Sequence, residues 1–110
     1  MKEKNLKNRI LLACSEKYQT VMFNNPVGFD KLRKIHYGLM RGSSDIIGWK
    51  SVKITPDMVG KSVAIFTAIE IKTKKGIVSD VQKNFIQRVL MAGGIAGVVR
   101  SEEGLRELLT

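Results

Sequence analysis

The sequence predicts an α/β fold with a mixed β-sheet flanked by α-helices, and three observations carry this prediction. An apolar, β-branched run at residues 63–73 is typical of a strand buried on at least one side. Ser79 and Gln82 stand at capping-box spacing and mark the start of a helix that reaches about residue 91. Two glycines end this helix, and residues 95–99 form a second buried strand. A helix between two strands makes a right-handed crossover, so the two strands are expected to be parallel.

The other elements are predicted from local patterns. Residues 3–18 are expected to form a helix with an apolar stripe at Leu6, Ile10, Cys14 and Tyr18. Short extended segments are expected at residues 21–23 and 35–37. Ser101 is expected to cap a last helix, whose early Glu102 and Glu103 favour the positive end of the helix dipole. The expected apolar stripe of the middle helix comprises Val81, Phe85, Val89 and Leu90.

Residues 45–54 and 63–72 are expected to pair as an antiparallel hairpin. The segment 55–61 between them has the proline and glycine content of a reversing turn. In this hairpin Asp45 lies roughly opposite Lys72 and within reach of Glu70. Glu70 lies seven residues beyond the start of the strand, about 23 Å along the chain at about 3.3 Å per residue, and Asp57 lies in the turn at that far end. Asp45 is therefore the better candidate for a site shared with Glu70.

Length and composition limit the class of protein. The chain has 110 residues, enough for one domain over 1–110 and too few for a second core. No apolar run approaches the roughly 18 residues of a membrane span, and no signal peptide is recognisable. One cysteine excludes an internal disulfide framework and a multi-cysteine zinc site. We expect a soluble, intracellular protein that does not bind membranes.

The charge is strongly positive. Lys and Arg total 19 against 10 Asp and Glu, which gives a formal net charge of +9. Such a balance favours a polyanionic partner, with a merely solvated surface as the simpler alternative. The cations gather in two clusters that bracket the candidate site in sequence, at Lys31, Arg33, Lys34 and Arg41, and at Lys74 and Lys75.

Glu70 and Lys72 are the strongest candidates for chemistry. Side chains alternate along a strand, so both project from one face of the strand 63–72. A carboxylate that holds a divalent metal, with a lysine beside it, is what phosphodiester hydrolysis needs. The simpler alternative is an exposed ion pair where the strand leaves the sheet. The surrounding motifs decide between these two interpretations.

These motifs occur in a recognisable order. They are Gly42-Ser43-Ser44-Asp45, Glu70-Ile71-Lys72, Lys74-Lys75-Gly76, an early helical Gln82, and Gly93-Gly94 followed by Val98-Val99-Arg100-Ser101. Over roughly residues 41–101 the chain resembles the VRR-NUC family, the virus-type replication-repair nucleases of the PD-(D/E)xK superfamily. The resemblance implies a restriction-endonuclease-like fold, with a mixed central sheet flanked by helices. It also implies a structure-specific DNA endonuclease that resembles Holliday junction resolvases.

The resemblance suggests a role for individual residues. Asp45, Glu70 and the Ile71 backbone carbonyl would bind Mg²⁺ or Mn²⁺, which suits oxygen ligands of this kind. Lys72 would position the attacking water. Gln82 would hold a water or a phosphate, or would serve only as the cap of its helix. Glu3 fits the family's acidic position on the first helix, or is a solvated acid there.

Further expectations concern the partners. The two basic clusters are expected to bind DNA, and Ser43 and Ser44 either contact a phosphate or only form the turn before Asp45. A symmetric homodimer is expected, with the first helix and residues 19–41 as contact surfaces, because cutting both strands needs two sites of opposite polarity. We expect the protein in the cytoplasm of a bacterial or phage-infected host cell. A non-catalytic nucleic-acid-binding module and a structure-specific RNase remain alternatives.

Overall fold

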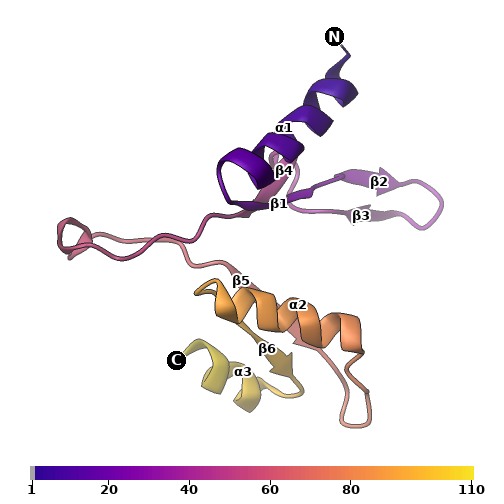
Figure 1. Cartoon of the computed structure of the whole chain (residues 1–110). Helices are drawn as coiled ribbons and strands as arrows, with labels where there is room; N and C mark the ends of the chain where they lie inside the picture. Colours follow the sequence, from indigo (N-terminus) through magenta and orange to yellow (C-terminus); the bar gives the residue numbers. More distant parts are fainter. Residues whose placement is uncertain (1) are drawn as a thin grey trace. The chain divides into compact units, whose positions relative to one another are not determined.

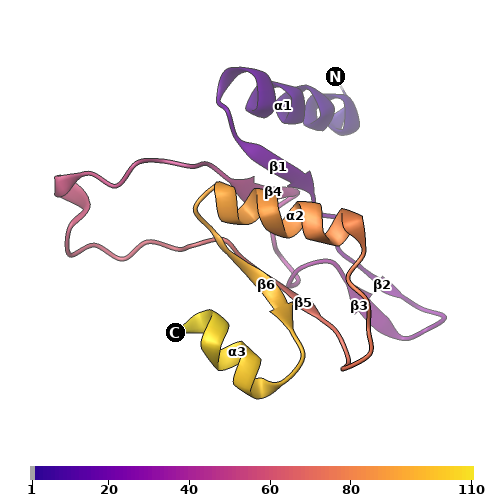
Figure 2. The same cartoon turned by 60° about the horizontal axis from the view of Figure 1, so that its bottom comes forward.

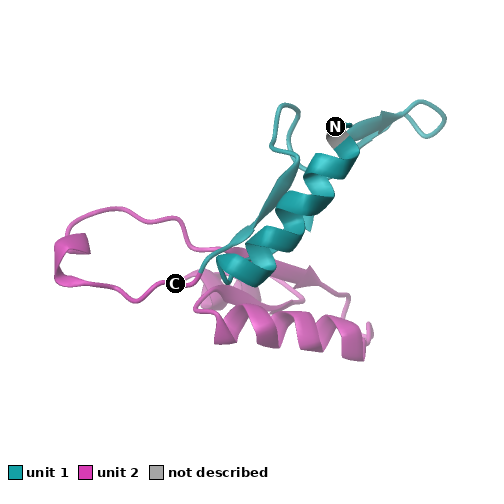
Figure 3. Cartoon of the chain, turned by 45° about the horizontal axis from the view of Figure 1, so that its top comes forward, with its two compact units in different colours: residues 1–50 teal, residues 51–110 magenta. Residues whose placement is uncertain are grey.

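The computed structural model describes residues 2–110 and every side chain among them except that of Glu3. These residues form three α-helices, one short 3₁₀ helix and three two-stranded sheets, so the predicted α/β class is confirmed. The chain divides into two compact units, residues 1–50 and residues 51–110, which Figure 3 shows in two colours. The expectation that residues 1–110 form one domain stays a prediction.

Unit 1 contains one helix and four strands. The helix α1 (Glu3–Lys17) precedes β1 (Val21–Asn24), β2 (Gly28–Asp30), β3 (Ile35–Tyr37) and β4 (Ile46–Trp49). Strand β1 pairs antiparallel with β4, and β2 pairs antiparallel with β3. The predicted helix and both short extended segments are therefore confirmed. The backbones of β1 and β4 approach closely at Gly48, where an added Cβ atom would lie 1.8 Å from the Val21 carbonyl oxygen.

The predicted apolar stripe of α1 is only partly covered. Leu6, Ile10 and Tyr18 are exposed, whereas Leu11 and Cys14 are half-buried. Within unit 1 the helix contacts β1, so only the face turned toward that strand loses water. A hydroxyl contact fixes the end of the helix, because Thr20 donates through both Oγ1 and its backbone N–H to the Cys14 carbonyl.

Unit 2 is built around two parallel strands with a helix on each side. Strands β5 (Thr67–Ile71) and β6 (Ile95–Val99) pair in parallel, as predicted, and the helix α2 (Asp80–Met91) connects them. The helix α3 (Glu102–Leu109) follows, and Figures 1 and 2 show the two strands between α2 and α3. The most buried side chains of the described chain are those of Val89, Ala96 and Val99, where the helices meet β6.

The ends of α2 form as the sequence predicts. Ser79 and Gln82 make a reciprocal capping box at the start, and Ser101 caps α3 by accepting from the Gly104 N–H. Gly93 ends α2 with a φ of +97°, a conformation that glycine adopts without strain. The predicted apolar stripe is partly wrong, because Val81 is 79 % exposed while Phe85 and Ile86 are half-buried. The helix covers only a two-stranded sheet, so its first turn stays in solvent.

The expected hairpin of residues 45–54 and 63–72 is wrong. Among the described residues β4 pairs with β1 and β5 pairs with β6, so no single mixed sheet forms. Residues 51–66 instead make a long excursion with a 3₁₀ helix, η1 (Pro56–Met58), as Figure 1 shows. Hydrogen bonds hold both ends of this segment on the rest of unit 2. Ser51 Oγ donates to the Ala92 carbonyl, and the Ile95 N–H donates to the Phe66 carbonyl. The apolar pattern correctly predicted that parts of both segments are strands, β4 and β5. It does not specify with which other strand each of them pairs.

No helix in the described part of the chain is long and apolar enough to cross a membrane.

Candidate functional site

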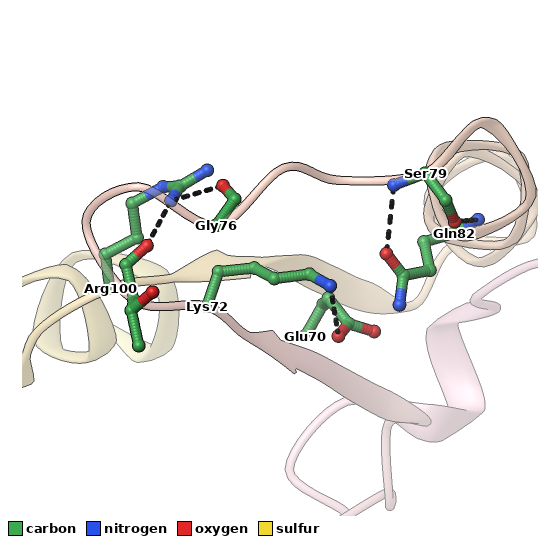
Figure 4. Close-up of polar contacts among 7 residues, drawn as sticks. Glu70, Lys72, Gly76, Ser79, Gln82 and Arg100 are labelled. Atoms are coloured by element: carbon green, nitrogen blue, oxygen red, sulfur yellow. Dashed lines mark hydrogen bonds and ion pairs between the residues drawn. The ribbon is translucent and has the colours of Figure 1, made fainter.

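Glu70 and Lys72 lie on one face of β5 and form an ion pair. Lys72 Nζ is 3.7 Å from Glu70 Oε2, and Figure 4 shows the ammonium reaching back toward the carboxylate. The Glu70 side chain is 31 % exposed and the Lys72 side chain is 21 % exposed, so the pair is neither fully solvated nor buried. The neighbouring Ile69 and Ile71 point to the other face and are exposed. The predicted alternation is therefore confirmed, and the pair sits on the face that α2 covers.

A hollow of about 290 Å³ lies between β5 and the first turns of α2. Glu70 lines its strand side and Gln82 lines its helix side, with apolar walls from Ala68, Phe85 and Ile86. An ionised carboxylate next to apolar walls loses part of its hydration, and a cation or a hydrogen-bond donor compensates for that loss. The hollow therefore offers a polar end at which a charged ligand is stabilised.

Gln82 has two functions open to it. Its backbone N–H donates to Ser79 Oγ at 3.1 Å, and its side-chain Oε1 accepts from the Ser79 N–H at 3.0 Å. The capping role is thus shown. The cap uses Oε1 and leaves the Nε2 amide as the donor that Gln82 presents at the hollow, on the side of β5 where Glu70 lies in Figure 4. Both interpretations of Gln82 are compatible with this geometry.

The carbonyl of Ile71 points to the edge of β5 that lies opposite β6. The Lys72 N–H donates to the Val99 carbonyl, and the Phe66 carbonyl accepts from Ile95, so even-numbered residues face β6. Backbone groups alternate along a strand, so the Ile71 carbonyl faces the other way. Because β6 is the only strand paired with β5 among the described residues, this oxygen is free of the ladder.

Arg100 holds the turn that carries Lys74 and Lys75. It follows β6 directly, and its Nη1 donates to the carbonyls of Thr73 at 2.5 Å and Gly76 at 2.9 Å (Figure 4). A third, longer contact reaches the Lys74 carbonyl at 3.4 Å. The Gly76 N–H closes the turn on Thr73, and both lysine side chains are exposed. The turn is therefore fixed, with two cations two or three residues beyond Lys72.

Asp45 belongs to unit 1, where it directly precedes β4. Asp45 is exposed. It lines a hollow of about 150 Å³ together with Leu6, Lys7 and Ile10 of α1. The predicted acidic residue of that helix, Glu3, is the first residue of α1, but its side chain lies outside the described part. Asp45 and Glu70 belong to different units, so their meeting at one metal ion stays a prediction.

Asn25 organises the segment that leads into Asp45. Its backbone N–H donates to the Asp45 carbonyl at 2.8 Å. Its side-chain Nδ2 donates to Ser43 Oγ and to the Ser44 carbonyl, both at 2.9 Å. Its Oδ1 accepts from the Leu39 N–H at 3.3 Å. Ser43 thus has a structural partner, which supports its role in the turn before Asp45.

The first basic cluster lies on a β-hairpin. Lys31, Arg33 and Lys34 occupy the turn between β2 and β3, and all three are exposed. Arg41 lies after β3 and lines a hollow of about 740 Å³ with Phe29, His36, Met40 and their neighbours. The sequence patterns predict no hairpin here, and the structure places three of the four predicted cations on one.

Two structural residues escaped the sequence analysis. Asn25 belongs to an Asn-Asn-Pro segment that reads only as a chain break, and Arg100 only as part of a motif. Asp57 lies in η1, between the two segments as predicted, and its carboxylate accepts from the Thr55 hydroxyl; its exclusion from the metal site stays a prediction.

The donor set suits a hard cation. Among the described side chains, no three of His, Cys, Asp or Glu gather as a metal site. Unit 2 supplies the Glu70 carboxylate and the Ile71 carbonyl, both oxygen donors. Mg²⁺ is commonly bound through one or two carboxylates together with substrate phosphates and water. The residues present therefore fit Mg²⁺ or Mn²⁺ and do not fit a closed zinc site.

The family model of the VRR-NUC domain matches residues 6–103, which is most of the chain. Comparisons with curated proteins and with solved structures found no match.

Proposed function

Because the chain belongs to the VRR-NUC domain family, we propose that it is a metal-dependent DNA endonuclease. The family implies a nuclease-type function and DNA as the substrate. One observation supports catalysis by this chain in particular. Glu70, which lines the hollow beside α2, forms a half-buried ion pair with Lys72 at 3.7 Å. A chain that used the fold only for binding would have no need of this pair.

Glu70 and the Ile71 carbonyl are the proposed metal-binding groups of unit 2, and Asp45 is the proposed ligand from unit 1. The free carbonyl of Ile71 supports this assignment, because an oxygen bound in the ladder would be a weaker ligand. Bound Mg²⁺ or Mn²⁺ supplies charge neutralisation of the phosphate and acidification of a water. Asp45 and Glu70 also provide the negative charge that keeps such an ion in a strongly basic protein.

Lys72 is proposed to orient the attacking water and to offset charge that develops on the phosphate. Its ammonium has three N–H donors, and the Glu70 carboxylate lies on one side of it, so other N–H groups can reach a water or a phosphate. The Nε2 amide of Gln82 is a donor at the hollow that Glu70 lines. The proposed products are a 3′ hydroxyl and a 5′ phosphate, as the family resemblance implies.

The proposed fold is that of the PD-(D/E)xK superfamily. The parallel pair of β5 and β6, the crossover helix α2 and the position of Glu70 and Lys72 near the end of β5 support this assignment. The basic turn at Lys74 and Lys75, held by Arg100, is the proposed phosphate-binding element of unit 2.

We further propose branched DNA as the substrate and a homodimer as the working form, in the cytoplasm of a bacterial or phage-infected host cell. Cutting both strands of a branched duplex needs two sites of opposite polarity, and a two-fold axis supplies them. The exposed Leu6, Ile10 and Leu12 on α1 support this helix as the contact surface, because they are apolar and unburied.

The test is a substrate panel. The purified chain is incubated with nicked, flapped, forked and four-way DNA, each with Mg²⁺, with Mn²⁺ and with a chelator. We expect cleavage only with metal, strongest on four-way DNA and at symmetric positions. Light scattering should give about twice the chain mass of 12.3 kDa. Binding without cleavage in any metal would contradict the enzyme, and cleavage of RNA alone would reassign the substrate.

A further inference from the structure

The hairpin of β2 and β3 carries a fixed tip of four residues, Lys31 to Lys34. Asp30 Oδ1 accepts from the backbone N–H groups of Leu32 at 2.9 Å and Arg33 at 3.2 Å. The Lys34 N–H donates to the Asp30 carbonyl at 2.7 Å, and Lys34 has a φ of +58°. One aspartate thus organises the whole turn, so the tip presents its side chains in a defined direction.

Apolar side chains of this hairpin are exposed on both strands and at the tip. Leu32, at the tip, is 92 % exposed, and Phe29, Ile35 and Tyr37 are 47 %, 53 % and 51 % exposed. The two strands contact chiefly each other, and Figure 1 shows them extending away from α1 within unit 1. Isolated two-stranded hairpins are marginally stable in water. These side chains are therefore available to a partner.

The charge of the tip indicates the partner. Three cations, Lys31, Arg33 and Lys34, surround Leu32, against the single acid Asp30. The Arg33 to Asp30 ion pair, at 3.8 Å with Arg33 75 % exposed, is a weak surface contact that leaves Arg33 available. A second copy of the chain would bring like charges together at the tip. A polyanion with an apolar interior, such as a DNA duplex at a break in base stacking, complements both the cations and the leucine.

We propose that the β2–β3 hairpin is a DNA-probing element, in which the tip cations bind backbone phosphates and Leu32 inserts as a wedge where base pairs are unstacked. Aliphatic wedges of this kind unstack base steps in many DNA-bending proteins. The inference rests on the proposed function for its ligand, and it deepens that function by giving the chain a means to select branched DNA. A branch point has already lost part of its stacking, so insertion there costs less than in a continuous duplex.

The test uses the full chain in a chelator, so that no DNA is cut. The probe is a four-way junction with 2-aminopurine beside the branch point, whose emission rises on unstacking. We expect the unaltered chain to raise this emission. Leu32→Ala should remove most of the rise while anisotropy shows DNA affinity within a few fold of the original. Met91→Ala is the matched control, because Met91 is an apolar side chain that is 79 % exposed on α2.

The cations are tested separately. Replacing Lys31, Arg33 and Lys34 by alanine should weaken DNA binding and reduce the slope of log affinity against log salt by about one unit per lost contact. An unchanged emission rise in Leu32→Ala, no rise with the unaltered chain, or an unchanged salt slope would overturn the proposal. So would a fall to the single-chain mass in Leu32→Ala, which would make the hairpin a self-association arm. None of these readouts involves cleavage, so failure of the nuclease itself is distinguished by the substrate panel.

Discussion

The backbone N–H of Asn25 donates to the carbonyl oxygen of Asp45 at 2.8 Å, so the residue after β1 fixes the backbone of the predicted metal ligand before β4. The Asn25 side chain extends this control to Ser43, Ser44 and Leu39 through three more hydrogen bonds. One asparagine therefore connects the end of β1 with the residues before β4, where the predicted ligand lies. Asn25 is in this account a positioning residue that acts through Asp45.

Asn25→Ala should therefore lower kcat by about 10- to 100-fold, because small displacements of a reacting group cost that much. It should also raise the Mg²⁺ concentration at half-maximal rate, while KM for DNA changes little. Asn24→Ala is the control, because the Asn24 side chain accepts from Lys7 Nζ on α1 at 3.1 Å. A kcat loss without any change in the Mg²⁺ dependence would reduce Asn25 to a purely structural residue.

Lys72 should be separable from the lysines of the neighbouring turn. Lys72→Ala should lower the single-turnover cleavage rate by two to three orders of magnitude, about the effect of removing one group that stabilises the transition state. Lys74→Ala and Lys75→Ala should mainly weaken DNA binding and reduce the salt slope by about one unit each. Equal losses of rate at all three positions would show that the face of β5 gives Lys72 no special role.

Arg100 should act on DNA through the turn that it holds. Arg100→Ala removes two close hydrogen bonds to the carbonyls of Thr73 and Gly76, so DNA affinity should fall even where Arg100 meets no phosphate. The loss should not add to that of Lys74→Ala, because both changes affect one turn. Arg88→Ala, on the exposed side of α2, is the control. Additive losses in the double variant would place Arg100 on the DNA independently.

Two glycines of unit 2 test its packing. A Cβ atom at Gly94 would lie 2.7 Å from Val89 Cγ1 and 2.8 Å from the Phe66 carbonyl oxygen, and that backbone atom cannot rotate away. Gly94→Ala should lower the free energy of unfolding by about 1–3 kcal/mol. At Gly104 the nearest atom is Ser101 Oγ at 3.6 Å, so Gly104→Ala should stabilise α3 by about 0.5–1 kcal/mol. Urea denaturation measures both, and the same sign for both would contradict this packing.

The sequence was a good guide wherever one local rule decides the outcome. The capping box of Ser79 and Gln82, the glycine end of α2 and the parallel pairing of β5 with β6 all depend on short-range chemistry or chain handedness. The shared face of Glu70 and Lys72 follows from strand alternation alone. The other predicted carboxylate, Asp45, was placed beside Glu70 by a hairpin that does not form, so its share in the site stays a prediction.

The sequence was a poor guide wherever the partner of an element decides. Residues 45–54 and 63–72 alternate as strands should, yet β4 pairs with β1 and β5 with β6. The predicted apolar stripes of α1 and α2 included Leu6 and Val81, which are exposed. Their exposure depends on how much of a sheet each helix covers, and the sequence of the helix does not specify this. Asn25 was missed because its contacts lie 14 to 20 residues away, beyond any local pattern.

The central claim is that Glu70 and Asp45 hold the metal at which DNA is cut. The most direct measurement is the single-turnover cleavage rate of four-way DNA across a Mg²⁺ titration, for Glu70→Gln, Asp45→Asn and the control Asp57→Asn. We expect the first two to lose more than about 100-fold in rate at every Mg²⁺ concentration while DNA binding survives. Asp57→Asn, in η1, should cut as the unaltered chain does. An inactive Asp57→Asn beside an active Asp45→Asn or Glu70→Gln would contradict the account.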